Sequence, residues 1–137
     1  MTKKIILFPL FAVVGLVFYY SWLPDPTLKS ETYLPQWLLI WSNQNYNLRT
    51  AIPFIAFGFL IQAYSNCKNS KKTDINKNLI FIQNLLVAGV VAFIAECGQF
   101  LLRDRSPDLM DVYFGVVGSL IGALVYNLFY KIRFKNA

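Results

Sequence analysis

Four long apolar runs constrain what this chain can fold into. A helix that crosses about 30 Å of hydrocarbon needs about 20 largely apolar residues. The runs lie at about residues 5–23, 48–64, 79–102 and 110–130. In a chain of 137 residues that is 56% hydrophobic and only 15% charged, they predict an all-α polytopic membrane protein, a single bundle of four transmembrane helices over residues 1–137.

The basic residues predict the orientation of this bundle. Lys and Arg close to short loops favour the cytoplasmic side of a membrane. Four of the 13 basic residues fall on the side of the outer loop 24–47, and nine fall on the side of both termini and the inner loop 65–78. We therefore expect both termini to be cytoplasmic, in a multi-pass membrane protein. The nine residues are Lys3, Lys4, Lys68, Lys71, Lys72, Lys77, Lys131, Arg133 and Lys135.

Two kinds of function are disfavoured by composition. The net charge of +6 is explained by topology, and no basic helix or known module indicates nucleic-acid binding. The absence of histidine excludes cysteine–histidine zinc sites and histidine-based catalytic triads. Cys67 and Cys97 are expected to lie too far apart for a disulfide. In the outer loop, Trp37, Trp41 and Tyr46 suit the headgroup zone and predict a short interfacial segment, with a ligand-facing aromatic lip as the alternative.

Polar residues gather at the junction of the third and fourth runs, in AECGQFLLRDRSPDLMDVYFG at 95–115. Glu96, Gln99 and Arg103 have helical spacing, which predicts one polar face on the third helix. The fourth helix carries a similar face. Because a short turn joins the two helices, we expect these faces to meet, with the glycines allowing close packing. The second face comprises Asp108, Asp111, Gly115, Gly118 and Gly122.

Glu96 is the most unusual of these residues because of its depth. It lies seven residues before Arg103, roughly 10 Å along a helix. An ionised carboxylate at such a depth costs about 2.5 to 3.5 kcal/mol or more unless it is paired or hydrated. Either Glu96 is protonated, or Gln99, Arg103 or water satisfies it.

A purely structural role is the alternative for the other acids. Ser106, Pro107 and Asp108 have the pattern of a helix start, with a serine cap, proline at the first position and an acid in the first turn. Asp108 and Asp111 would then only favour the helix dipole. Arg103 and Arg105 would pair with them, and Asp104 would be a solvated turn residue.

The same residues resemble the signature of the VanZ-like membrane proteins. That pattern is matched by Glu96 and Gln99, then Arg105, and then Asp108 and Asp111. Gly118 and Gly122 match its glycines, whereas Gly115 stands where the family has asparagine. Upstream, Asn47, Pro53 and Gly58 match the pattern of the family's second helix. The resemblance implies a role in the bacterial cell envelope, and the family takes its name from a protein associated with low-level teicoplanin resistance.

Three kinds of function remain open. The first is an envelope protein whose outward-facing polar site, between the third and fourth helices and among membrane lipids, binds a lipid-linked or glycan ligand and contributes to glycopeptide (teicoplanin) resistance. The second is an enzyme acting on a lipid phosphate or glycolipid, with a divalent cation held by Asp108 and Asp111 and with Glu96 as acid/base. The third is a proton-coupled transporter or flippase component, in which four spans would require a homo-oligomer. The candidate ligand-binding residues are Glu96, Gln99, Arg103, Arg105, Asp108 and Asp111, the catalytic candidates among them being Glu96, Asp108 and Asp111.

Overall fold

The computed structural model describes residues 3–70, 76–103 and 105–135. Within these ranges the chain forms five helices and no strand, which confirms the all-α prediction. Lys71, Lys72 and Asp104, which the sequence analysis placed in loops, lie outside the described residues. The helices are α1 (Lys3–Ser21), α2 (Gln36–Gln44), α3 (Tyr46–Asn69), α4 (Lys77–Gln99) and α5 (Leu109–Lys135).

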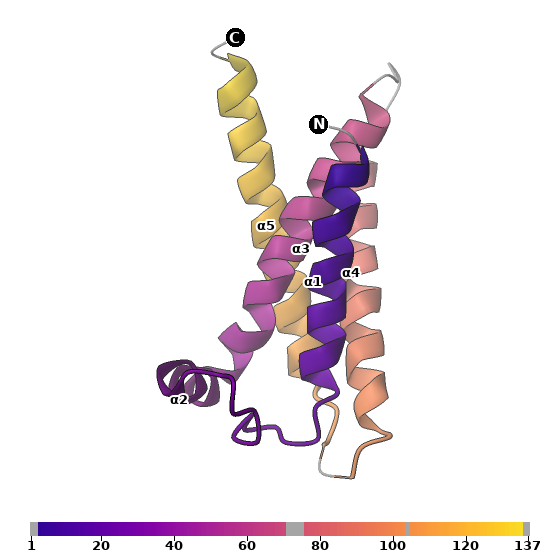
Figure 1. Cartoon of the computed structure of the whole chain (residues 1–137). Helices are drawn as coiled ribbons and strands as arrows, with labels where there is room; N and C mark the ends of the chain where they lie inside the picture. Colours follow the sequence, from indigo (N-terminus) through magenta and orange to yellow (C-terminus); the bar gives the residue numbers. More distant parts are fainter. Residues whose placement is uncertain (1–2, 71–75, 104, 136–137) are drawn as a thin grey trace.

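Four of these helices, α1, α3, α4 and α5, are long and apolar enough to cross a membrane. They run side by side, and the start of α1 lies at the same end of the bundle as the end of α5 (Figure 1). We call this the terminal end and the opposite end, which carries α2, the loop end. Large apolar side chains such as Phe8, Leu86 and Phe129 are exposed on the outer surface of the bundle. Such a surface suits lipid rather than water, and the chain is a multi-pass membrane-type protein.

The helix bounds differ in detail from the apolar runs. Helix α3 extends beyond 48–64 at both ends, because its added residues, such as Tyr46 and Asn69, are polar or amphipathic and escape a hydropathy criterion. Helix α4 ends at Gln99, before the end of the run at 102. The short helix α2 lies across the bundle axis at the loop end, with Trp37 exposed (Figure 1). The interfacial role of this segment remains a prediction.

Helices α3 and α5 are in direct backbone contact. A Cβ atom on Gly118 would collide with the carbonyl oxygen of Ala51, and one on Gly122 with that of Ile55. The glycines therefore permit close packing, but these two face α3 instead of α4. The expectation that the whole glycine face meets α4 was wrong, because the short turn between α4 and α5 makes them neighbours without dictating which face is shared. Gly115 lies against both helices, at Ala92 of α4 and Phe54 of α3.

An apolar core separates two polar regions of the bundle. The core consists of Phe54, Phe57, Ala88 and Ala92. On α4, these alanines lie between Asn84, toward the terminal end, and Glu96, toward the loop end.

The polar region on the terminal side joins three helices by amide hydrogen bonds. Asn84 Nδ2 donates to Gln62 Oε1 at 2.7 Å, and Gln62 Nε2 donates to Asn127 Oδ1 at 3.3 Å. Ser65 Oγ donates to Asn84 Oδ1 at 2.9 Å. These bonds satisfy polar groups that would be costly to bury alone, so the network fixes α3, α4 and α5 relative to one another.

Candidate functional site

Glu96 lies in the last turn of α4, and its carboxylate reaches the start of α5. Its Oε2 atom accepts a hydrogen bond from the backbone N–H of Asp108 at 3.0 Å, and its Oε1 atom accepts one from Gln99 Nε2 at 2.9 Å. Both residues of this side-chain pair are buried. A carboxylate is favoured at a helix N-terminus, where backbone N–H groups lack partners within the helix. The side chain of Gln99 and the backbone at the start of α5 therefore supply the hydrogen bonds that the Glu96 carboxylate needs.

The C-terminal end of α1 is tied to the same turn of α4. Gln99 Nε2 also donates to Ser21 Oγ at 3.1 Å. Ser21 Oγ and Trp22 Nε1 both donate to the carbonyl oxygen of Ala95, at 3.2 and 3.0 Å. The indole lies over Gly98, where any side chain would strike it. Two helix ends far apart in the sequence thus form one polar wall.

Arg105 belongs to the connection between α4 and α5 but binds the end of α1. Its Nη2 atom donates to the carbonyl oxygen of Tyr20 and its Nε atom to that of Leu23, each at 3.0 Å. Burial, followed by the neighbouring Arg49 guanidinium, lowers the pKa of Arg105, while carboxyl groups including that of Glu96 act in the opposite direction. An arginine remains protonated in proteins, so Arg105 keeps a cation at the loop end.

Arg49 and Thr50 bring the first turns of α3 to the same place. Thr50 Oγ1 donates to Asp111 Oδ1 at 2.9 Å, which links α3 to α5. Arg49 Nη1 donates to the carbonyl oxygen of Pro26 in the outer loop at 2.9 Å. Sequence reasoning missed both residues as site candidates. One signal for them was available in the sequence. Both residues lie at the polar start of an apolar run, and Asp111 lies at the corresponding start of the fourth run, so all three are expected at a similar depth in the membrane.

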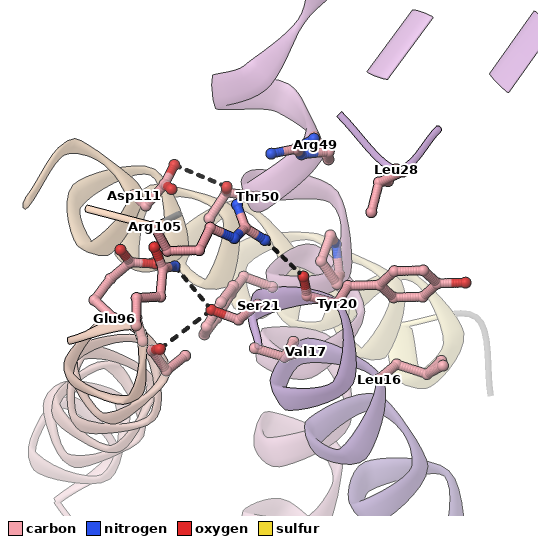
Figure 2. A pocket seen from close by; sticks show the side chains of 15 residues that line it. Leu16, Val17, Tyr20, Ser21, Leu28, Arg49, Thr50, Glu96, Arg105 and Asp111 are labelled. Atoms are coloured by element: carbon pink, nitrogen blue, oxygen red, sulfur yellow. Dashed lines mark hydrogen bonds between the residues drawn. The ribbon is translucent and has the colours of Figure 1, made fainter. Parts of the chain in front are cut away.

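These groups surround a cavity of about 270 Å³ at the loop end. It occupies the space between α1 and α5, which pack against α3 and α4 but not against each other. Figure 2 shows Glu96, Arg105 and Asp111 on one side of the cavity and Leu16, Val17 and Leu28 on the other. The lining residues are Leu16, Val17, Tyr20, Ser21, Leu28, Arg49, Thr50, Pro53, Phe54, Ala92, Ala95, Glu96, Gln99, Arg105 and Asp111.

Four of the predicted site residues, Glu96, Gln99, Arg105 and Asp111, line this cavity, and Arg103 does not. The predicted polar face from Glu96 to Arg103 was wrong in its last member, because α4 ends at Gln99 and helical spacing does not continue beyond it. Arg103 is exposed at the turn. Arg105, two residues later, takes the position near Glu96.

Asp108 also lies outside the cavity, and it acts as a helix cap. Its Oδ1 atom accepts the backbone N–H of Met110 at 2.8 Å, and α5 begins at Leu109. The predicted cap at Ser106 was therefore wrong by two residues, since Ser106 and Pro107 precede the helix.

Among the described residues, no group of three or more acidic or cysteine side chains could hold a metal ion. The hypothesis that Asp108 and Asp111 share a cation gains no support from this geometry.

The sequence pattern of the VanZ/LLP1 family matches residues 3–130. The chain belongs to the VanZ/LLP1 family. No curated protein and no solved structure matches it. The match covers α1, α3 and α4 in full and α5 as far as residue 130, so the VanZ/LLP1 assignment extends beyond the residues 45–125 on which the resemblance rested. The cavity thus lies within the region common to the VanZ/LLP1 pattern.

Proposed function

We propose that this protein is a binding protein of the bacterial cell envelope, located in the cytoplasmic membrane, whose loop-end cavity holds the anionic group of a lipid-linked or glycan ligand. By binding such a ligand, the protein would contribute to resistance against glycopeptides such as teicoplanin. The proposal concerns recognition, not turnover.

An outward-facing cavity is supported by the distribution of basic residues. Lys3, Lys4, Lys68, Lys131 and Arg133 belong to helix segments at the terminal end (Figure 1). By the preference of Lys and Arg for the cytoplasmic side, the loop end would face outward. That side of the membrane carries the envelope components on which glycopeptides act.

The observation that carries the proposal is the pair of guanidinium groups at one cavity. Arg49 uses Nη1 and Arg105 uses Nε and Nη2 for carbonyl oxygens. Each guanidinium keeps further N–H donors, and such donors form strong, directional bonds with phosphate and carboxylate oxygens. Because the bonds to carbonyl oxygens hold both groups in place before binding, less side-chain freedom is lost when a ligand arrives.

The test is native mass spectrometry of the purified protein released from lipid nanodiscs. Arg49→Gln and Arg105→Gln remove one cavity cation each, and Arg103→Gln is the matched control at an exposed arginine outside the cavity. We expect wild type and Arg103→Gln to retain the same anionic ligand and each cavity variant to retain at least tenfold less. Equal retention by all four folded proteins, as judged by their melting temperatures, would overturn the proposal.

A cellular assay tests the connection to glycopeptides. Expression of wild type in a susceptible bacterium should raise the teicoplanin concentration needed to stop growth, and Arg105→Gln at equal expression should not. A rise that is the same for both proteins would separate any resistance from ligand binding in the cavity.

A further inference from the structure

The walls of the loop-end cavity differ in chemistry from one side to the other. Arg105 and Asp111 lie on one side, and Leu16 and Val17 of α1 lie on the other (Figure 2). Phe54 and Ala92 of the apolar core also line the cavity. A ligand that fits this cavity therefore needs both an anionic group and an apolar portion, which a sugar chain alone does not offer.

The apolar side of the cavity reaches the surface of the bundle that faces lipid. Leu16 lines the cavity and is nevertheless 51% exposed. It lies in the C-terminal half of α1, five residues before Ser21, or roughly 7.5 Å along the helix axis. An alkyl chain lying on Val17 can therefore continue over Leu16 into the bilayer without crossing the headgroup zone.

The size of the cavity indicates how much of such a ligand it encloses. Its volume of about 270 Å³ is just below the range of about 300–1,000 Å³ that is typical of small-molecule pockets. This space holds an anionic headgroup and the first carbons of a chain, but not a whole membrane lipid. The remaining chain must leave by an apolar route, and Leu16 marks one.

The outer loop covers the cavity at Leu28, which is buried and lines it. Its backbone has φ 56°, a conformation that is uncommon for residues other than glycine. Hydrogen bonds from Arg49 to Pro26 and from Asn43 Nδ2 to Thr27 hold the loop beside it. An apolar side chain kept in this conformation shields the cavity from water, as an alkyl chain requires.

We propose that the ligand is a single-headed anionic amphiphile, with a phosphate or carboxylate group between Arg49 and Arg105 and with its chain lying on Val17 and Leu16. This inference rests on the proposed function and selects its lipid-linked form. On this proposal, Val17 determines the specificity for the alkyl chain of the ligand and not for its anionic group.

The test compares inorganic phosphate, butyl phosphate and octyl phosphate, with octyl glucoside as an uncharged amphiphile, by native mass spectrometry from phosphatidylcholine nanodiscs. Val17→Ser places a hydroxyl on the apolar wall. Val90→Ser is the matched control, because Val90 is 57% exposed and does not line the cavity. Since both variants are measured in the same bilayers, partition of the probes into lipid cancels from the comparison.

We expect octyl phosphate to bind wild type at least tenfold more tightly than inorganic phosphate, with gains of up to about fourfold for each enclosed methylene. Val17→Ser should reduce that ratio at least threefold, and Val90→Ser should leave it unchanged. If inorganic phosphate and octyl phosphate bind equally, or if both valine variants have the same binding ratio, the proposal of an amphiphilic ligand is overturned, whereas the proposal of anion binding stands. If octyl glucoside binds as well as octyl phosphate, or if no phosphate binds, the proposed function itself fails.

Discussion

The carboxylate of Glu96 accepts the backbone N–H of Asp108 at 3.0 Å, so the end of α4 satisfies the beginning of α5. Asp108 in turn caps the helix through its own side chain. The connection between the two helices is therefore closed by a contact between residues 12 positions apart in the sequence. This contact explains an acid at the depth of Glu96 without assigning it a role in proton transfer.

Replacing Glu96 with glutamine should lower stability more than it affects ligand retention. Glutamine offers one carbonyl oxygen where Glu96 offers two acceptors, so either the Asp108 N–H or Gln99 Nε2 loses its hydrogen bond to residue 96, and in the second case Gln99 Nε2 keeps its bond to Ser21. Leaving a buried donor unsatisfied costs about 1–3 kcal/mol. The free energy of unfolding of Glu96→Gln, measured in mild detergent with a denaturant titration, should fall by that amount. If the stability of Glu96→Gln were unchanged while a catalytic or transport activity of the protein were lost completely, an acid/base role for Glu96 would be favoured instead.

Replacing Gly122 with alanine should destabilise the bundle. A methyl group there meets the carbonyl oxygen of Ile55, so α3 and α5 must move apart. Overpacking of this kind typically costs about 1–3 kcal/mol. Gly15→Ala is the matched control, because nothing lies within 4 Å of a Cβ atom on Gly15. The check is the melting temperature of both variants in detergent, and equal values would argue against direct backbone contact at Gly122.

The outer loop should change conformation between about pH 4 and pH 2. Hydrogen bonds from the Thr27 hydroxyl and from the Thr27 and Ser30 N–H groups lower the pKa of Asp25 from 3.8 to about 2. A carboxyl group whose pKa is lower in the folded loop stabilises that loop above its ordinary pKa, and this stabilisation is lost as the pH falls through the lowered value. The amide resonances of Thr27 and Ser30 should shift across this window. In Asp25→Asn the titration should be absent, and its persistence would assign it to another group.

The loop end should be reachable from outside an intact cell. In a background with Cys67→Ser and Cys97→Ser, a membrane-impermeant maleimide should label Ser106→Cys, whose parent residue is exposed at the loop end. Ser70→Cys, exposed at the terminal end, should be labelled only after the cells are permeabilised. The reversed pattern would place both termini outside and would contradict the predicted orientation.

Much of the fold was predictable, because spanning a membrane requires long apolar runs and α1, α3, α4 and α5 have them. Glu96 was identifiable because an acid within such a run is costly. Asp111 was identifiable from its helical spacing and from the family resemblance. Arg49 and Thr50 were not, because polar residues are ordinary at the ends of membrane helices. Arg103 was chosen with Arg105 because helical spacing cannot show where α4 ends.

The partner of the glycine face was equally beyond the sequence. The spacing of Gly118 and Gly122 predicts a close-packed face, but it does not say which helix packs there. In the sequence, the whole of α4 lies between α3 and α5, so no short turn indicates that these two helices are in contact. Periodicity thus defines a face on one helix, and only the assembled bundle assigns its neighbour.

The apolar core of Phe54, Phe57, Ala88 and Ala92 borders the cavity through Phe54 and Ala92. In the described part of the chain it separates Glu96 from Asn84, which are about 18 Å apart along α4 at ~1.5 Å per residue. Under the proposed function, a molecule that enters at the loop end would meet this core and would leave by the same end. Under the binding role that we propose, the protein would sequester its ligand instead of passing it on, and its effect on the envelope would scale with the number of copies per ligand molecule.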